Sequence, residues 1–331
     1  MKNKQKGTKK STFLKVFVII LLIFLFLLGI LCGVGYWYIQ DKLGKIGYDK
    51  LSAEEITVNA GVDNNLKDYR NIALLGIDAR SDTFNSGRSD CIIIVSINEK
   101  TKDVKLLSVY RDTYLDVTDN GLTKITHAYA YGGPKLALSS LNRNLDLNIT
   151  EYVTVNFDTV KTVVDAVGGI KMKITNEEKG QVPRISSAGT YTLDGEQALA
   201  YARIRHASGG DYKRTERMRD VLTAVFEKAK TLNIGQLNSL ADTILPHIRT
   251  NINSGEILSL IPEIASFHIG ESMGWPNEVK GITLDLWYAV PVTLEENVIQ
   301  LHKDLFGQEN YEPSQTVKDI SEKIAKKTGY E

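Results

Sequence analysis

Two aspartates flank a polar segment that separates two apolar runs, and their placement suggests a metal site. Asp78 follows the run 71–77, and Asp90 precedes the run 91–97. A loop that returns between adjacent strands brings both carboxylates to the edge of an α/β sheet where ligands bind. Two carboxylates, completed by phosphate oxygens and water, are a common way to hold Mg²⁺. On spacing alone, the alternative of ordinary turn and cap aspartates is preferred.

Four arginines form a second group of candidates. Arg203 and Arg205 are two residues apart, so they project from one face if the chain is extended there. Guanidiniums side by side repel each other, and their forks suit phosphate oxygens. Arg214 and Arg217 share a face in the first turn of a helix expected at 214–230, where a docked phosphate would offset the unfavourable dipole. The alternative is a solvated basic surface.

Arg111 and Asp112 follow the apolar run 104–109 and fall at the same predicted edge. A charged pair at the end of a buried strand suits ligand binding, but a local ion pair explains it equally well.

Motifs of other catalytic classes are absent from the sequence. The chain has no GxSxG elbow and no P-loop ending, and the five histidines show no HExxH spacing.

Alternating strands and helices must position these residues. Strands are expected at 71–77, 91–97, 104–109, 152–155, 170–174 and 280–286. Helices are expected at 134–145, 157–167, 194–202, 214–230, 234–247, 254–267, 294–306 and, as an exposed final helix, 314–327. This order predicts one α/β domain with a central sheet covered on both faces.

The N-terminal region predicts a membrane anchor. Residues 13–31 are apolar except for Lys15, and about 20 such residues span a bilayer. Lysines without acidic residues precede this run, which places the N-terminus in the cytoplasm. A cleaved signal peptide, the competing interpretation, has a shorter apolar region and a small-residue cleavage site. We expect a cytoplasmic tail at 1–12, a single-pass transmembrane anchor at 13–38, a juxtamembrane spacer at 39–68 and an extracellular catalytic domain at 69–331.

Composition narrows the function further. The 331 residues carry a net charge of zero, which gives no support for nucleic-acid binding across the whole surface. The two cysteines, Cys32 and Cys91, are not expected to meet, because one ends the apolar N-terminal run and the other begins a predicted strand. We therefore expect neither a disulfide framework nor a cysteine metal site.

Ordered motifs over about residues 70–230 resemble the LytR–CpsA–Psr family of bacterial cell-envelope proteins. They are LLGIDAR…GRSD at 74–90, SVYRDTYLDV at 108–117, KITHAYAYGGP at 124–134, YVTVNFDTVKTVVDAVGGI at 152–170, LDGEQALAYARIRH at 193–206 and DYKRTERMRDVL at 211–222. Each motif alone is weak, but their order and completeness make the resemblance specific.

The resemblance implies a three-layer α/β/α domain with a mixed central sheet. It also implies an apolar tunnel for a polyprenyl chain and an arginine-lined mouth for its pyrophosphate. By motif, Asp78 and Asp90 match aspartates that bind Mg²⁺ (or Mn²⁺). The arginines that match the pyrophosphate site are Arg88, Arg111, Arg203, Arg205 and Arg214.

The implied activity is a phosphotransferase reaction at the cell membrane. An anionic glycopolymer, of wall teichoic acid or capsular type, would be carried on undecaprenyl pyrophosphate. A peptidoglycan sugar hydroxyl would attack the phosphorus nearest the glycopolymer, and undecaprenyl phosphate would leave. Pyrophosphatase activity is a further expectation. Asp112 and Asp211 are candidates for the proton acceptor. The alternatives are a polyprenyl-lipid carrier without turnover and a transcription attenuator, although only about fifteen residues would be cytoplasmic.

Two positions depart from the family pattern. Met218 stands where members often have a glutamine, so it cannot donate a hydrogen bond to phosphate. Tyr110 replaces the proline of a common PRD motif, which is expected to reshape the loop that presents Arg111.

Overall fold

The computed structural model describes residues 44, 47–78, 84, 87–205, 207, 210–253, 256 and 266–330. The chain divides into two units, Met1–Lys45 and Ile46–Glu331, and all the elements named below belong to the second. The predicted tail and transmembrane anchor lie outside the described residues. Within those residues, no helix combines the length and apolarity needed to cross a bilayer.

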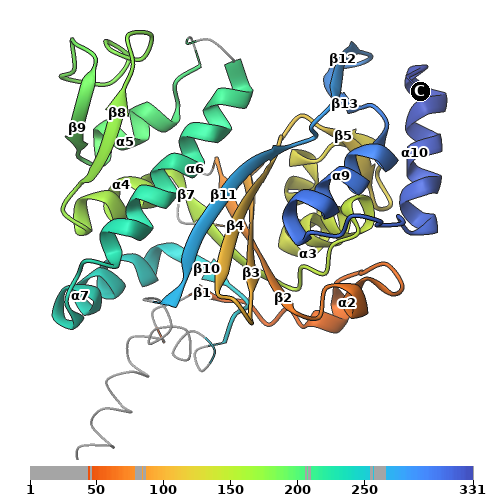
Figure 1. Cartoon of the computed structure of the whole chain (residues 1–331), viewed down its shortest axis with the longest axis horizontal. Helices are drawn as coiled ribbons and strands as arrows, with labels where there is room; N and C mark the ends of the chain where they lie inside the picture. The colour runs from red at the N-terminus through yellow and green to blue at the C-terminus, as the bar shows by residue number, and fades with distance from the viewer. Residues whose placement is uncertain are drawn as a thin grey trace, which may run out of the picture. The chain divides into compact units, whose positions relative to one another are not determined.

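A mixed sheet of seven strands lies at the centre of the described domain (Figure 1). The pairs β1–β10, β7–β2 and β4–β11 are parallel, and the other neighbours are antiparallel. In spatial order the strands are β1 (Gly47–Tyr48), β10 (Ile248–Thr250), β7 (Glu151–Asn156), β2 (Tyr69–Ile77), β3 (Ser89–Asn98), β4 (Asp103–Val109) and β11 (His268–Trp275).

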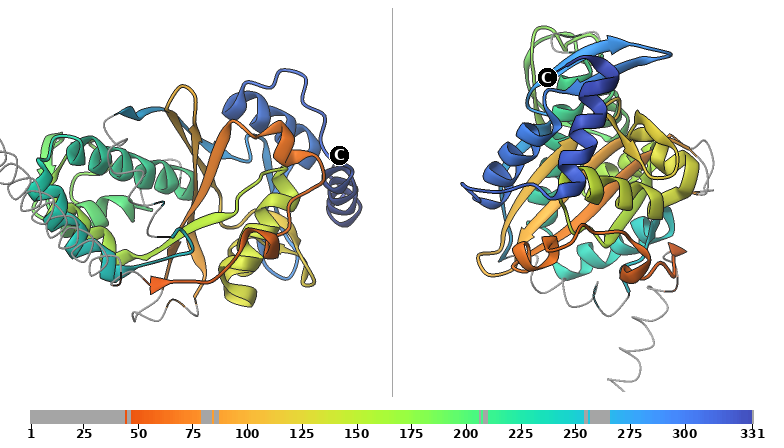
Figure 2. Two further views of the ribbon diagram at one scale, coloured as in Figure 1. Left: turned by 90° about the horizontal axis from the view of Figure 1, so that it is seen from below. Right: turned by 90° about the vertical axis from the view of Figure 1, so that its right-hand side faces the viewer.

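Helices cover both faces of this sheet, as Figures 1 and 2 show. The cause is the two-residue period of the strands. In β2, Ala73, Leu75 and Ile77 enter the core that contains α3 (Thr126–Leu145), α9 (Leu294–Phe306) and α10 (Gln315–Thr328). Ile72 and Leu74 enter the core on the other face, below α6 (Gly210–Ala229). The mixed α/β fold expected from the sequence is confirmed.

Shorter elements surround these layers. The remaining helices are α2 (Val62–Asn65), α4 (Phe157–Ala166), α5 (Gly195–Ala202), α7 (Ile234–Ile244) and the 3-10 turns η1 (Ala53–Glu55) and η2 (Leu245–His247). Three hairpins complete the described fold: β5 (Tyr114–Val117) with β6 (Gly121–Lys124), β8 (Ile170–Ile174) with β9 (Gly189–Leu193), and β12 (Val279–Thr283) with β13 (Trp287–Pro291).

Several predicted elements differ from the observed ones. The strand expected at 280–286 is a hairpin, because the chain turns at Leu284 and Leu286 between β12 and β13. α3 begins eight residues before the expected start at 134, and Gly132 and Gly133 interrupt it with non-helical dihedrals. Strands β9 and β11 were not anticipated. The helix expected at 254–267 falls mostly outside the described residues.

Two expectations about exposure were wrong. The final helix is not a free surface helix, because Val317, Ile320 and Ile324 of α10 are buried in the main core. The segment 47–68 is not a detached spacer either. Ile56 and Leu66 are buried in the same core, so the domain begins near residue 46 rather than at 69.

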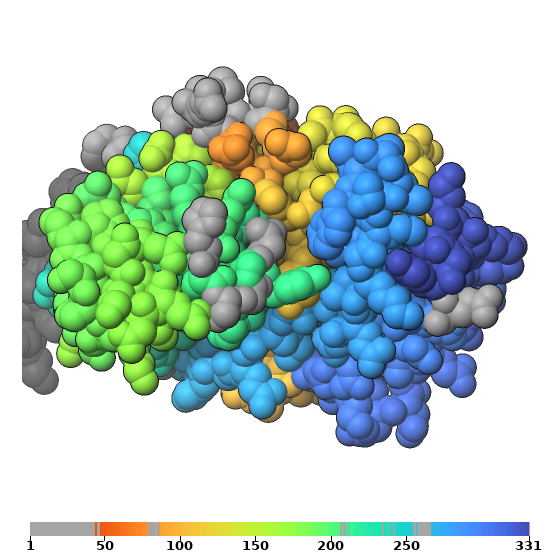
Figure 3. Space-filling view, turned by 90° about the horizontal axis from the view of Figure 1, so that it is seen from above, coloured from red at the N-terminus to blue at the C-terminus, as the bar shows by residue number. Residues whose placement is uncertain are grey.

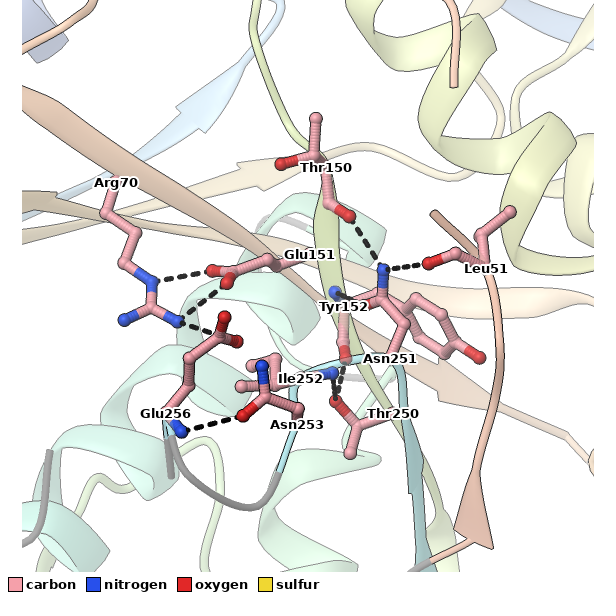
Figure 4. A network of polar contacts seen from close by, with 10 residues as sticks. All are labelled: Leu51, Arg70, Thr150, Glu151, Tyr152, Thr250, Asn251, Ile252, Asn253 and Glu256. Atoms are coloured by element: carbon pink, nitrogen blue, oxygen red, sulfur yellow. Dashed lines mark hydrogen bonds and ion pairs between the residues drawn. The ribbon is translucent and has the colours of Figure 1, made fainter. Parts of the chain in front are cut away.

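A polar network holds the strands together at the end of the sheet opposite the predicted ligand edge (Figure 4). Arg70, at the start of β2, donates from Nε and Nη2 to the Glu151 carboxylate at the start of β7, each at 2.6 Å. Asn251 donates to the carbonyls of Thr150 at 2.8 Å and Leu51 at 3.1 Å. These contacts tie the starts of β2 and β7 to the segment that follows β10.

Candidate functional site

The two aspartates meet where β2 ends and β3 begins. Ile77 pairs with Ser89 across the antiparallel ladder, and the Asp78 amide donates to the Arg88 carbonyl at 3.2 Å. Asp78 and Asp90 both line a polar cavity of about 260 Å³. Chain return between adjacent strands thus brings the carboxylates to one site, as their spacing suggested.

Arginines from two other elements line the same cavity. α5 ends at Ala202, so Arg203 and Arg205 flank the buried Ile204 and are themselves exposed. Both face the cavity, and Arg203 lies over the Phe157 ring at 4.4 Å from its centroid. They are joined there by Arg214, whose side chain is only 2% exposed.

The expected helix start was wrong. α6 begins at Gly210, so Arg214 and Arg217 lie in its second turn rather than its first. The argument that a phosphate offsets the helix dipole at Arg214 therefore does not hold, because that field weakens beyond the first turn. What remains is that Arg214 lines the same cavity as Arg203 and Arg205, and arginine forks suit phosphate oxygens.

Arg217 is placed away from the cavity. Its Nε donates to Glu178 at 2.7 Å, and both side chains are at most 7% exposed. Its Nη1 donates to the carbonyl of Ile204 at 3.3 Å, between Arg203 and Arg205. Arg217 thus supports the segment that presents the two exposed arginines, and the structure does not bring it among the cavity-lining residues.

We predict that Glu178→Gln destabilises the domain by about 3–5 kcal/mol, because it leaves Arg217 buried without its carboxylate partner. Burial opposes ionisation of Glu178, but hydrogen bonds from the Thr175 amide and Arg217 outweigh it and lower the pKa. A lowered pKa contributes stability above the unfolded value, about 4.3, and this is lost as pH falls through the folded pKa. Urea titrations from pH 7 to pH 3 should therefore show the difference between wild type and variant shrinking in acid.

The control for this prediction is Glu196→Gln. Glu196 also pairs with an arginine, Arg184, at 2.8 Å, but both side chains are more than half exposed. Solvent screening makes such a pair nearly neutral for stability. Equal destabilisation by the two substitutions would contradict the structural role of Glu178.

A chain of ion pairs runs along the rim of the cavity. Arg111 contacts Asp90 at 3.2 Å and Asp112 at 3.3 Å, and Lys124 contacts Asp112 at 2.7 Å. Arg111 thus reaches the cavity through Asp90. Arg111 and Lys124 both contact the Asp112 carboxylate, which therefore orients Arg111.

The donor set at Asp78 and Asp90 fits Mg²⁺. Magnesium keeps several waters and uses one or two carboxylates together with substrate phosphates. Among the described side chains there is no cluster of three or more acidic, histidine or cysteine groups that would enclose a metal. Two carboxylates on one polar cavity therefore suit a metal shared with a phosphate ligand.

An apolar cavity of about 150 Å³ lies between the sheet and the helices α4, α5 and α6. Phe157 and Met218 line both this cavity and the polar one. Burial raises the pKa of the Cys91 thiol in its wall to about 12, so the thiol stays neutral there. The apolar lining is completed by residues such as Leu74, Ile93, Val160, Val163, Leu199, Val221, Leu222 and Val225.

Both departures from the family pattern have a structural role. Met218 lines both cavities, and its apolar side chain matches the lining of the apolar one. The Tyr110 amide donates to the Trp275 carbonyl at 3.0 Å, a bond that proline could not make. The Tyr110 ring packs edge-on against Tyr212 of α6, with centroids 4.5 Å apart, and so connects β4 to the helix of Arg214.

The structure describes the surroundings of the other candidates, Arg88 and Asp211, only in part. Arg88 is exposed beside Asp78, and the Asp211 side chain lies outside what the structure describes. Phe157, Lys124 and the junction role of Met218 were missed by sequence reasoning. The signal available for Phe157 was its position directly after a strand at the ligand edge.

Comparison with known proteins identifies a family and several similar transferases. The model of the LytR_cpsA_psr family matches residues 35–273. The Bacillus subtilis polyisoprenyl-teichoic acid–peptidoglycan teichoic acid transferase TagT is 35% identical over 232 residues, which cover 65% of this chain and 71% of that protein. The Enterococcus faecalis transferase TagU, described by the same activity, is 34% identical over 248 residues, 74% of this chain and 80% of that protein.

Solved structures of such transferases are similar in fold to this chain. TagT bound to LIIa-WTA superposes with a TM-score of 0.62 at 31% identity, covering 73% of this chain and 91% of that one. The family protein YwtF (TagT) with bound octaprenyl pyrophosphate lipid superposes with a TM-score of 0.58 at 28% identity, covering 78% and 97%. The family model matches more than half of the chain, and TagU is more than 30% identical over more than two thirds of it. This chain belongs to the LytR–CpsA–Psr family.

Proposed function

We propose that this protein transfers an anionic glycopolymer from a polyprenyl pyrophosphate carrier to a sugar hydroxyl of peptidoglycan. One observation carries the proposal: a polar cavity with three arginines and two aspartates adjoins an apolar cavity, and Phe157 and Met218 line both. A prenyl pyrophosphate has matching parts: a dianionic or trianionic head group, which suits the polar cavity, and a long apolar chain, which suits the apolar cavity. The relatives named as teichoic acid transferases support a teichoic-acid or similar polymer as cargo.

The residues divide the work by chemistry. Arg203 and Arg205, exposed on the cavity wall, bind pyrophosphate oxygens and neutralise charge on the bridging and leaving oxygens. Arg214, which is buried, offers a positive charge in the wall of the polar cavity. Phosphoryl transfer needs positioning and charge neutralisation more than covalent catalysis, so an arginine-rich site suffices.

Asp78 and Asp90 would hold the Mg²⁺. When bound, the ion supplies Lewis-acid stabilisation of the phosphate charge. Arg111 positions Asp90 through its 3.2 Å contact and is in turn oriented by Asp112. Asp211 remains the candidate for receiving the hydroxyl proton, and the apolar run at 13–31 supports a reaction beside the membrane surface.

The test is direct transfer. Full-length protein in detergent is mixed with a polyprenyl-pyrophosphate-linked saccharide labelled in the sugar, and with undecorated peptidoglycan oligomers. The proposal predicts label on the oligomers and one polyprenyl phosphate released per transfer. Stable donor binding without any phosphate-containing product would favour the lipid-carrier alternative instead.

Metal removal is expected to reduce transfer by about 100-fold or more, since a phosphate-bound metal contributes several kcal/mol of charge stabilisation. Transfer is measured after treatment with a chelator and during titration with MgCl₂. Asp78→Asn and Asp90→Asn should raise the Mg²⁺ concentration needed for half-maximal rate, whereas Asp158→Asn, on α4 outside the cavity lining, should not. An unchanged rate in chelator would exclude the metal role.

A further inference from the structure

The first turn of α3 is attached directly to the rim of the polar cavity. The Thr126 hydroxyl donates to the Ser89 carbonyl at 3.0 Å, and the Thr126 amide donates to the Arg111 carbonyl at 3.1 Å. Asp90 follows Ser89 and pairs with Arg111. The residues just after Thr126 therefore lie at the strand ends that carry the acidic and basic groups of the proposed site.

His127 lies in this turn, and Tyr131 lies one turn further along α3. The Tyr131 side chain is 55% exposed, and its ring lies 5.6 Å from the His127 ring, centroid to centroid. His127 Nδ1 shares a hydrogen bond with the Thr123 hydroxyl at 2.9 Å, which fixes the ring orientation. Burial, with Lys124 and Arg88, lowers the pKa of His127. Because Nδ1 is engaged by Thr123, Nε2 is the ring nitrogen that can bind a ligand hydroxyl.

The β12–β13 hairpin provides the opposite side of this surface. The Ala289 amide donates to the Asp112 carbonyl at 3.0 Å, so the hairpin is attached to the ion-pair chain of the rim. At its turn, the exposed Asp285 carboxylate accepts a hydrogen bond from the Tyr288 hydroxyl at 2.7 Å. Figure 3 shows the blue surface of the hairpin beside the yellow surface of β6 and the start of α3. The two sides adjoin at Lys124, whose Nζ lies over the Tyr288 ring at 5.9 Å from its centroid. Lys124 follows Thr123, the hydrogen-bond partner of His127, and Tyr288 is the partner of Asp285.

This combination fits a sugar better than another kind of partner. A pyranose ring has an apolar face of C–H groups, which stacks on an aromatic ring, and an edge of hydroxyl groups, which need donors and acceptors. A protein partner would need a larger continuous apolar patch. The Asp285 carboxylate disfavours an anionic lipid headgroup.

We propose that Tyr131, His127 and Asp285 form the subsite that binds the saccharide acceptor beside the pyrophosphate site. The Tyr131 ring stacks on one sugar residue, and His127 and Asp285 bind its hydroxyls. The assignment of the acceptor to peptidoglycan rests on the proposed function. The motif KITHAYAYGGP then has a role, since Thr126 attaches the helix to the rim and His127 and Tyr131 face the acceptor.

Saccharide binding tests this subsite without requiring turnover. The probe is a fluorescently labelled N-acetylglucosamine–N-acetylmuramic acid tetrasaccharide, and its anisotropy is measured with full-length protein in detergent. Tyr131→Ala should weaken binding by about fivefold to tenfold through loss of one stacked ring. Tyr131→Phe should retain binding, and Asp285→Asn should weaken it. The matched control is Tyr48→Ala, which removes a ring that is 54% exposed on β1, at the other edge of the sheet.

The outcomes separate this subsite from the proposed reaction. Absence of saturable binding by wild type, or equal binding by wild type and Tyr131→Ala, overturns the subsite. Transfer assays run in parallel should show a raised KM for acceptor in Tyr131→Ala with an unchanged KM for donor. Saccharide binding that depends on Tyr131 in a protein that transfers nothing would uphold the subsite and reject the transferase activity.

Discussion

Replacing both Arg203 and Arg205 with alanine is expected to lower kcat/KM for glycopolymer transfer by about 10³-fold or more. Both guanidiniums line the polar cavity, and both are exposed, so their charges are available to a phosphate rather than committed to a protein carboxylate. Removing a single preorganised charge-stabilising donor already costs about 10²–10³-fold in comparable sites. The rate is measured with lipid-linked donor below its KM, so that donor binding and chemistry both contribute.

Two comparisons make this result interpretable. Folding stability should be unchanged, because neither side chain is buried. Arg184→Ala, which removes an exposed arginine paired with Asp194 and Glu196 outside the cavity lining, should retain full activity. Wild-type rates in the Arg203→Ala/Arg205→Ala variant would reject the arginine assignment.

Filling the apolar cavity is expected to abolish use of long-chain donors while leaving the polar cavity intact. Val163 of α4 lines the apolar cavity but not the polar one, so Val163→Trp places an indole in the path of a prenyl chain. Burial contributes about 0.8 kcal/mol per CH₂, so displacing two or three isoprene units costs several kcal/mol. That corresponds to more than about 100-fold in affinity for an undecaprenyl or octaprenyl donor.

The chain-length dependence separates this effect from general damage. Affinity for a one- or two-isoprene pyrophosphate should change little in Val163→Trp, because its head group still meets Arg203, Arg205 and Arg214. Val163→Ala enlarges the cavity and should keep long-chain binding. Equal loss for short and long donors, or undiminished long-chain binding in the tryptophan variant, would show that the chain binds elsewhere.

Local rules predicted the main sheet well. The runs at 71–77, 91–97 and 104–109 are long, β-branched and bounded by polar residues, and they became β2, β3 and β4 with small changes at their ends. The helix at 294–306 was found because its apolar period is strong and Thr293 caps its start. These elements set the edge on which the site lies.

Tertiary packing decided what local rules missed. Half of the residues in β11 are exposed, and the segment is a strand because it pairs in parallel with β4. α10 appeared solvent-exposed in sequence because it is mostly polar, yet three apolar residues at helical spacing bury one face. The start of α6 was placed four residues late, because a helix beginning at Gly210 has no clear sequence cap.

The sequence predicted most residues of the candidate site but only part of their arrangement in space. Spacing indicated that Arg203 and Arg205 would share a face, and both line one cavity with Asp78 and Asp90. It could not indicate that Arg217 would turn to the buried Glu178, because that partner lies 39 residues away in the chain. The role of Phe157 depends on β7 ending beside α5, which sequence alone does not reveal.

The most direct test of the two-cavity account is a crystal structure of this protein with a prenyl pyrophosphate. We expect electron density for the pyrophosphate between Asp78, Asp90 and the arginines at 203, 205 and 214. The prenyl chain should pass Phe157 and Met218 into the cavity under α4 and α6. Density for the head group outside this pocket, or for the chain along the protein surface with the apolar cavity unfilled, would contradict it.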